Sequence, residues 1–186
     1  MNETLQVIAN RRSIRKYKPE QIADEEMQQI MEAAIFAPSA RNQQQWHFTV
    51  VQNKELIDKM AGIIQSNALN SGESHAARFM STPGFHVFFH APTVVLISHI
   101  TGGHFIEVDC GMAAQNILLA AEALGIGSCV IGFSRFLLLS REGLDLLREL
   151  GMPEGYSHLC AIALGYPEGQ HPPMPPRNRD VVNYIK

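Results

Sequence analysis

Apolar positions along the chain fall into helical and strand-like patterns. Spacings of three and four predict helices over residues 3–10 and 25–37, the second capped by Asp24 and ended by Pro38. Two further helices are expected from polar caps, one after Asn53 to about Gln65 and one from Ser140 to the Gly151–Pro153 stop. Apolar runs predict strands at Trp46–Val51, Thr93–Ser98, Ser128–Ile131 and His158–Leu164.

The longest periodic stretch runs from Phe105 to Leu124, with Gly125 as the residue after its C-cap. Its apolar residues lie on nearly every side of the predicted helix. A helix of this kind is buried in a core or between subunits. A domain of 20.7 kDa has limited room to enclose it, so the pattern favours an oligomer.

Residues 66–84 are rich in Ser, Asn and Gly and predict a mobile excursion, with a short helix near Ala76–Met80. Helices and strands alternate without a regular βαβ order. The expected fold class is therefore α+β, on one domain that spans residues 1–186.

Composition narrows the classes of function. Fifteen Lys and Arg against eighteen Asp and Glu give a net charge of −3, which does not favour nucleic acid as a partner. The three cysteines are far apart and lie in apolar surroundings, as expected for reduced thiols in the cytoplasm. The longest apolar stretch is about half of the ~20 residues that a membrane span needs, and the first residues do not have the order of a secretory signal.

The segment RRSIRKY near the start places Arg11, Arg12 and Arg15 around Ser13. A solvated basic turn is one interpretation. The other is a phosphate clamp, because guanidinium groups bind phosphate oxygens in pairs and stay charged at any cellular pH.

Two other segments allow similar alternatives. Pro38–Gln44 is either an ordinary turn or a set of amides suited to a planar heterocycle. Arg177 and Arg179 follow PPMPP and are either solvated charges on a loose end or the tip of a stiff arm.

Three other motifs lack the context that their usual functions require. Gly125–Gly132 is rich in glycine but follows a helix and enters a strand, the reverse of the dinucleotide-binding order. His86 and His90 lie in HVFFH, which is expected to be extended, so their spacing does not place them over one metal ion. No GxSxG sequence supports a catalytic serine.

Taken together and in order, several segments resemble the nitroreductase family of FMN-dependent oxidoreductases over nearly the whole chain. They are RRSIRKY, APSARNQQQWHF, DCGMAAQNILLAAEALGIGSCVIG, LGYPEG and the basic, proline-rich tail. The resemblance implies a central, mostly antiparallel sheet flanked by helices. It also implies a homodimer that exchanges its C-terminal arms and binds FMN at the subunit interface.

The resemblance also assigns residues. Arg11, Arg12, Ser13 and Arg15 would hold the phosphate and ribityl end of FMN, with Arg177 or Arg179 approaching the same phosphate. The ring would be lined by one subunit's loop and by a strand end of the other: Pro38, Ser39, Ala40, Asn42, Gln44, then Val130, Ile131 and Gly132. Gln45 stands where the family loop usually has proline.

The implied activity is hydride transfer from NAD(P)H through flavin N5 to an electron-poor acceptor such as a nitroaromatic or quinone, in a ping-pong sequence. FMN supplies this chemistry, so no side chain is assigned as catalytic and no metal is expected. The alternatives are a flavin-binding or flavin-storage protein without turnover, and a helical interface protein whose arginines are only solvated.

Overall fold

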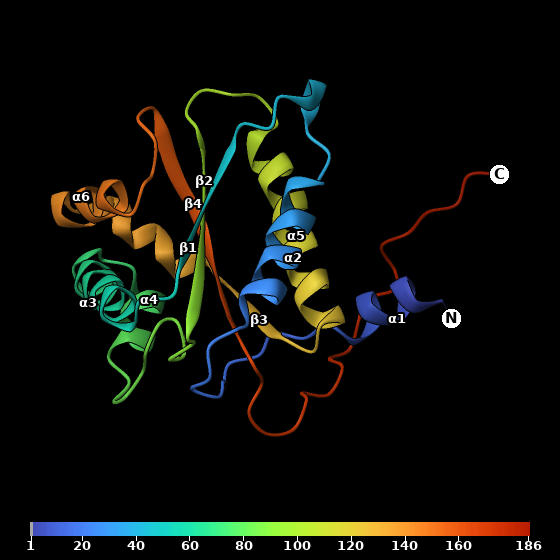
Figure 1. Ribbon diagram of the computed structural model, residues 1–186, viewed down its shortest axis with the longest axis horizontal. Helices are drawn as coiled ribbons and strands as arrows, with labels where there is room; N and C mark the ends of the chain where they lie inside the picture. The colour runs from blue at the N-terminus through green and yellow to red at the C-terminus, as the bar shows by residue number, and fades with distance from the viewer. Residues whose placement is uncertain (1) are drawn as a thin grey trace.

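The computed structural model describes residues 2–186 and is built on one four-stranded antiparallel sheet (Figure 1). The strand order is β1-β2-β4-β3. The strands are β1 (Trp46–Val51), β2 (Thr93–Ile100), β3 (Gly127–Ile131) and β4 (Tyr156–Gly165). The predicted α+β class and the antiparallel sheet are confirmed.

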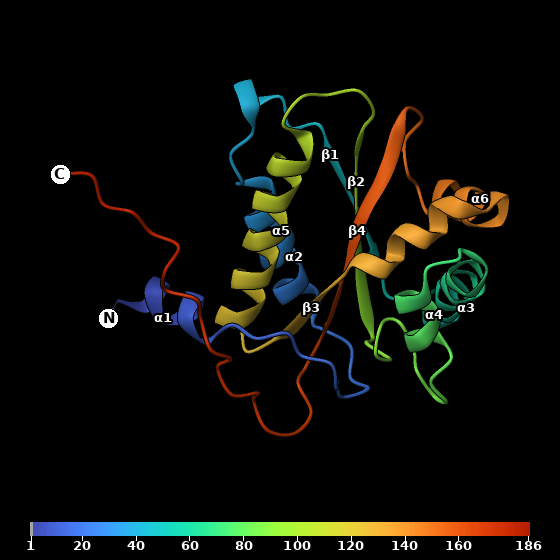
Figure 2. The same cartoon turned by 180° about the vertical axis from the view of Figure 1, so that it is seen from behind.

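Helices cover both faces of the sheet, as the two opposite views show (Figures 1 and 2). One face carries α2 (Asp24–Ile35) and α5 (Ile106–Ala123). The other carries α3 (Lys54–Asn70), α4 (Ser74–Met80), the 3₁₀ helix η2 (Gly132–Leu139) and α6 (Arg141–Glu149). Two hydrophobic clusters fill the two spaces, so the central strand β2 is buried from Thr93 to Ser98. Short elements α1 (Glu3–Asn10) and η1 (Ala40–Asn42) lie at the periphery.

Local caps explain most element boundaries. The Asn53 side chain accepts a hydrogen bond from the Leu56 N–H, and Ser140 accepts one from Gly143, as predicted. Gly125 has a φ of 72°, and the next residue, Ile126, donates its N–H to the Ala121 carbonyl at the end of α5. This is the left-handed helix stop predicted for Gly125.

Several predicted boundaries are wrong, among them the end of α2, which is Ile35 and not residue 37. The N-cap of α2 is Ala23, not Asp24, and the Glu26 carboxylate accepts the Ala23 N–H at 3.3 Å. Helix α3 continues to Asn70, so residues 66–70 are not part of an excursion. Burial of Ala68 and two hydrogen bonds from the Asn67 amide to η2 and Ser140 hold this last turn.

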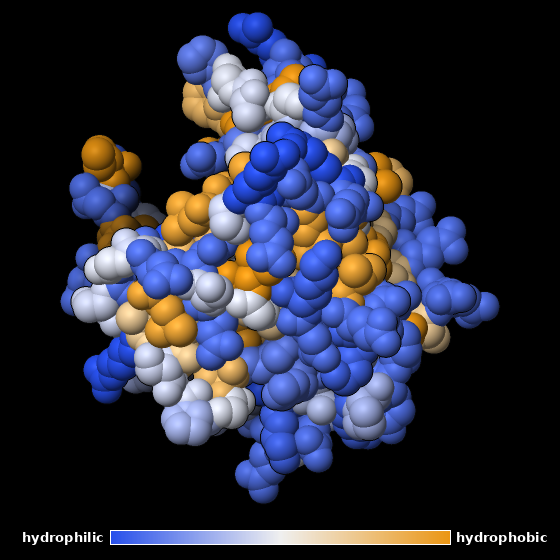
Figure 3. Space-filling model, turned by 90° about the vertical axis from the view of Figure 1, so that its left-hand side faces the viewer, coloured by the Kyte–Doolittle hydropathy of each residue, from blue (hydrophilic) through white to orange (hydrophobic). Residues whose placement is uncertain are grey.

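Helix α5 buries one side and exposes another. Ile117 and Ala121 are fully buried, whereas Val108 is 55% and Met112 is 37% exposed. The apolar character noted along the sequence is therefore divided between the sheet and an uncovered surface. Figure 3 views the opposite side of the molecule, that of α3 and α6, where apolar side chains gather in the middle of the face and polar ones surround them.

Candidate functional site

A cavity of about 610 Å³ lies where β3 ends and η2 begins. Its wall includes all three residues of the predicted ring-contacting stretch, Val130, Ile131 and Gly132, together with Arg15. The rest of the wall is mainly apolar and aromatic: His75, Phe79, Phe85, Val87, Phe89, Cys129, Phe133, Arg135 and Leu159. Its size and lining are those of a small-molecule site.

The basic segment is held along the sheet edge by its apolar residues. Ile14 and Tyr17 are buried, and the Ile14 N–H donates to the Ser128 carbonyl at 2.9 Å. The Tyr17 hydroxyl donates to the Ile14 carbonyl at 2.6 Å. Because these residues face inward, Ser13 and Arg15 are left toward the open side, and Arg15 reaches the cavity.

Arg12 does not share this arrangement. Its side chain is buried, and Nη1 donates to the backbone carbonyls of residues 9, 10 and 11 at 2.7–3.0 Å. These carbonyls belong to the last turn of α1 and the residue after it, where the helix leaves acceptors without partners. Arg12 thus caps α1 through Nη1, while its Nε is buried without a hydrogen-bond partner, so phosphate binding by Arg12 stays a prediction. Arg11, Ser13 and Arg15 form the rest of the candidate clamp.

Cys129 connects the clamp to the cavity wall. Burial raises the pKa of its thiol, and the Arg15 charge and the Ser13 hydroxyl beside it oppose that shift. The basic segment and the end of β3 are thus neighbours. The structure brings Arg15 and the predicted ring-contacting residues Val130–Gly132 to one cavity, with Ser13 bridged to Ser128 beside it.

Gly132 leaves space in this wall. A Cβ built on it would meet no atom within 4 Å, so the backbone there is open to a ligand. Glycine is needed at position 127 for a different reason, because a Cβ there would lie 2.9 Å from the Ile14 side chain. Its glycine lets the basic segment approach β3.

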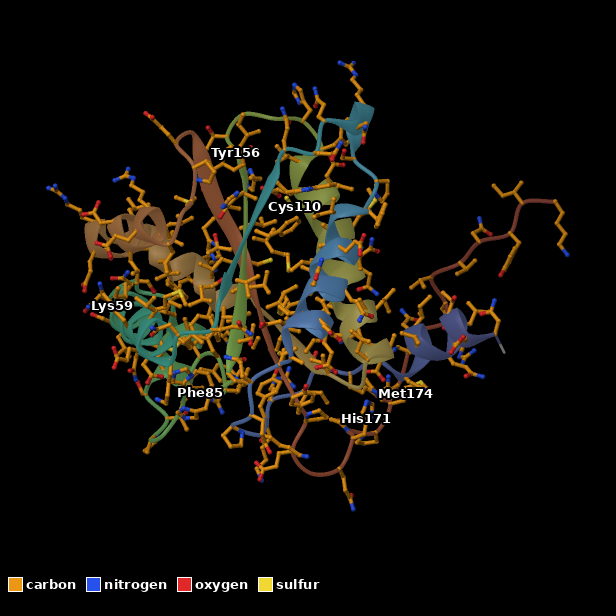
Figure 4. The ribbon with its side chains drawn as sticks, in the orientation of Figure 1. Lys59, Phe85, Cys110, Tyr156, His171 and Met174 are labelled. Carbon is orange, nitrogen blue, oxygen red and sulfur yellow. The ribbon has the colours of Figure 1, made fainter. Side chains whose placement is uncertain are left out.

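The loop predicted to line the ring lies at the other end of the molecule. The Gln45 carbonyl accepts the Ile100 N–H at the end of β2, whereas the clamp lies beside Ser128, at the level of Thr93, where β2 begins. Seven residues of strand separate these levels by about 23 Å. In Figure 4, Phe85 in the cavity wall and Tyr156, the first residue of β4, lie toward opposite ends of the sheet.

Within that loop the backbone is unusual. Arg41, Asn42 and Gln44 all have φ near 50°, a conformation that is uncommon outside glycine. The Ser39 hydroxyl accepts the Gln44 N–H at 3.0 Å, and the Asp109 carboxylate accepts the Ala40 N–H at 3.0 Å. Pro38 is exposed, and so are the side chains from residue 41 to 44. The loop is held in shape but faces outward.

The tail runs from Tyr166 beneath α5 and past α1, and its end projects from the body (Figures 1 and 4). His171 lies 3.8 Å from the Glu122 carboxylate near the end of α5. Arg177 and Arg179 are exposed, and so are Val181, Val182, Tyr184 and Ile185.

Sequence reasoning missed the aromatic wall and a buried polar pair behind it. His75 and Phe79 come from α4 and pack edge to face at 5.0 Å, a contact that their spacing of four could have indicated. His158 and Ser134 lie behind Ile131 and carry no sequence signal of their own.

The histidine segment also differs from its prediction. His86 and His90 stack at 4.3 Å because residues 87–90 form turns, not an extended strand. The His86 Nδ1 accepts the N–H groups of Phe88 and His90, which stabilises this turn. In the described part of the chain, no three His, Cys, Asp or Glu side chains are grouped to hold a metal. Over residues 2–186, no helix has both the length and the apolar character to cross a membrane.

These features define an α+β protein with a ligand cavity beside a cationic sheet edge. The sequence pattern of the Nitroreductase family matches residues 8–166. The chain belongs to the nitroreductase family, and the resemblance noted in the sequence is confirmed. The enzyme class that the family implies is an NAD(P)H-dependent oxidoreductase.

Solved structures agree with this assignment. A nitroreductase with bound FMN from Bacteroides fragilis is 30% identical, with a TM-score of 0.94 and full coverage of both chains. Another, from Desulfitobacterium hafniense and also with bound FMN, is 36% identical, with a TM-score of 0.91 and full coverage of both chains. A relative found by sequence, an FMN reductase of Bacillus subtilis that uses NAD(P)H, is 31% identical, and the match covers 99% of this chain and 74% of that one.

Proposed function

We propose that this protein is an FMN-dependent oxidoreductase that transfers a hydride from NAD(P)H to an electron-poor acceptor such as a nitroaromatic or a quinone. The observation that carries the proposal is the cavity in which Arg15 meets the Val130–Gly132 wall. Family membership and the FMN-bound neighbours support the cofactor. The predicted ping-pong order belongs to the same proposal.

The residues present fit FMN at both of its ends. Arg11, Ser13 and Arg15 offer two permanent cations and a hydroxyl for the phosphate and the ribityl chain. The flat ring suits a wall that is mostly aromatic and apolar, and the open space over Gly132 leaves backbone accessible to it. When bound, FMN supplies the hydride-transfer chemistry between nicotinamide and acceptor.

The chain's own residues then bind and orient FMN and the acceptor, and they exclude water from the cavity. Arginine charges hold the anionic end in place, and the aromatic side chains of α4 and η2 offer faces on which a planar acceptor can stack. Backbone N–H groups at the end of β3 provide fixed dipoles where negative charge develops. No side-chain nucleophile or general base is required, so no residue is assigned as catalytic.

The complete site is proposed to need two copies of the chain. The loop with Pro38, Ser39, Ala40, Asn42 and Gln44 lies about 23 Å from the clamp along the sheet and is bonded to α5, and none of these residues lines the cavity of its own chain. A homodimer would bring the loop of one subunit to the cavity of the other. The exposed apolar side chains of α5 and of the tail provide a surface for that contact.

The projecting tail fits the same arrangement. Its end is exposed and leaves the body of the chain, with apolar side chains that a monomer leaves in water. In the proposed dimer the two arms are exchanged, and Arg177 or Arg179 approaches the phosphate. A cytoplasmic location and a single domain over residues 1–186 remain part of the proposal.

The test is the absorbance spectrum of the purified protein, followed by anaerobic addition of NADH or NADPH. Bound FMN gives a yellow protein, and bleaching by a nicotinamide shows that the flavin accepts a hydride. A colourless protein that takes up no added FMN would overturn the proposal. Bound FMN that neither nicotinamide reduces would favour the flavin-storage alternative. Sedimentation of the holoprotein then shows whether it is a dimer.

A further inference from the structure

Two buried polar side chains meet behind the cavity wall. His158 on β4 and Ser134 on η2 are 3% and 0% exposed, and the His158 Nε2 lies 2.9 Å from the Ser134 Oγ. The Ser134 hydroxyl in turn donates to the Ile131 carbonyl at 2.7 Å. A chain of two hydrogen bonds therefore joins the third residue of β4 to the last residue of β3.

The direction of this chain follows from the number of protons available. A serine hydroxyl has one proton, and Ser134 uses it on the Ile131 carbonyl. The contact with His158 must then be a bond that the imidazole donates, so the proton of the neutral ring is on Nε2. Burial lowers the pKa of His158 to about 4, with a smaller contribution from His99, so the ring stays neutral at cellular pH.

Irregular pairing of β4 brings His158 to this position. Ile97 pairs with Cys160 but the next residue, Ser98, pairs with His158, so Leu159 is left as the extra residue of a bulge. Leu159 contributes to the cavity wall, while His158 faces η2. The bulge thus places Leu159 in the cavity wall and its neighbour His158 behind that wall.

The bond to Ile131 fixes the direction of the following N–H group. In a planar trans peptide, the carbonyl of Ile131 and the N–H of Gly132 point in opposite directions. Ser134 holds the carbonyl toward the buried side, so the Gly132 N–H is directed away from it. Gly132 is exposed, lines the cavity and would leave even an added Cβ without neighbours within 4 Å.

We propose that His158 and Ser134 are positioning residues that hold the Ile131–Gly132 peptide with its N–H toward the ligand in the cavity. This role rests on the proposed function, in which that ligand is FMN. A donor fixed before binding stabilises negative charge on the reduced flavin more than the charge-neutral oxidised ring. The pair therefore acts on affinity and on reduction potential together.

The experiment compares four variants in the holoprotein. His158→Phe and Ser134→Ala break the chain, while His158→Gln keeps an N–H donor of similar reach. Ser140→Ala is the matched control, because it removes another serine hydroxyl, the N-cap of α6, from a position outside the cavity wall. FMN dissociation constants come from fluorescence titration, and midpoint potentials from equilibration with redox dyes.

We expect His158→Phe and Ser134→Ala to weaken FMN binding roughly tenfold, the effect of losing one well-placed hydrogen bond, and to make the midpoint potential more negative. His158→Gln restores both values to within about threefold, and Ser140→Ala changes neither although it lowers stability. Nitrogen NMR of the protein without added FMN should show His158 as the Nε2–H tautomer.

Several outcomes would overturn the positioning role. Wild-type affinity and potential in both chain-breaking variants would leave the pair as packing only, and an Nδ1–H tautomer would contradict the bond direction. If His158→Phe does not fold, Ser134→Ala carries the comparison. A wild-type protein that binds no FMN would remove the proposed function and this role with it, whereas normal wild-type binding with unaffected variants removes the role alone.

Discussion

The Asp109 carboxylate, in the first turn of α5, accepts the backbone N–H of Ala40 at 3.0 Å. The bond ties the loop after α2 to the helix that would lie at the subunit interface. Asp109 is buried, and the loop around Ala40 contains three side-chain-bearing residues with positive φ. One carboxylate thus helps to hold an uncommon backbone in shape before any ligand or second subunit is present.

Asp109→Ala should therefore lower the free energy of unfolding by about 1–3 kcal/mol, the range for a partner left without its buried hydrogen bond. It should also weaken FMN binding in the proposed dimer, because the loop loses its shape. Glu107→Ala is the control, since it removes an exposed acid from the same helical turn and should cost only ~0.3–1 kcal/mol through the helix dipole. Equal effects of the two variants in urea unfolding and FMN titration would contradict a specific role for Asp109.

Local signals predicted the fold better than the site. Asn53, Ser140 and Gly125 act within a few residues of themselves, so their roles as caps could be predicted. The end of α3 could not, because three of its last five residues, Ser66, Asn67 and Asn70, are weak helix formers, and tertiary contacts such as the bonds of Asn67 hold this turn. Such contacts join residues that are distant in the sequence, so local composition cannot predict them.

The site shows the same limit. Arg12 is identical in kind to Arg11 and Arg15, and only the path of α1 turns its guanidinium back to the helix end. His158 and Ser134 lie 24 residues apart in the sequence, and their meeting depends on the bulge in β4. Position in space, not residue type, decides both cases.

The two glycines at the ends of β3 should respond differently to alanine. Gly127→Ala places a Cβ 2.9 Å from the Ile14 side chain and should cost about 1–3 kcal/mol in stability, as overpacking usually does. Gly132→Ala meets no neighbour within 4 Å, so stability should stay near the wild-type value while FMN affinity falls. Thermal unfolding and fluorescence titration separate the two. Unchanged FMN affinity in Gly132→Ala would contradict ligand contact at this backbone.

Arg11 provides a direct test of the anion site. Arg11→Ala should weaken FMN binding by about 1–3 kcal/mol, equivalent to roughly 5- to 150-fold, because a charge-assisted bond to phosphate is lost. Lys16→Ala is the matched control: Lys16 lies on the same segment and carries the same charge, but pairs with Glu168. Riboflavin, which lacks the phosphate, should bind both variants equally. A similar loss in the two variants would point to general charge and not to a clamp.

Arg135 should influence the preference of the protein for anionic over uncharged electron acceptors. Both charged groups of the cavity wall, Arg15 and Arg135, are cationic, and Glu73 binds Arg135 through both carboxylate oxygens. Removing this counter-charge in Glu73→Gln should lower KM for 4-nitrobenzoate by about two- to fivefold, the size of an exposed ion-pair effect, and Arg135→Ala should raise it. KM for uncharged 4-nitrobenzyl alcohol serves as the reference. Equal changes for the two acceptors would show that the pair acts on the fold of α4 and not on acceptor charge.

Protonation of His158 should limit stability in acid. Its pKa is lowered to about 4 by burial, whereas an unfolded histidine titrates near 6.5. Between these values the unfolded chain binds a proton that the folded chain does not. The contribution of His158 to the free energy of unfolding is therefore fully present above about pH 6.5. It falls as the pH drops toward 4, by at most about 1.4 kcal/mol per pH unit.

His86, whose pKa burial also lowers, adds a loss of the same sign, so the wild-type protein alone cannot separate the two. The comparison is between wild type and His158→Gln, since both keep His86. Urea unfolding at intervals from pH 7 to pH 4 should show a shallower decline for the variant, even where its stability at pH 7 is lower. Parallel curves would mean that His158 titrates alike in both states, and that the buried neutral ring bonded to Ser134 is not maintained in solution.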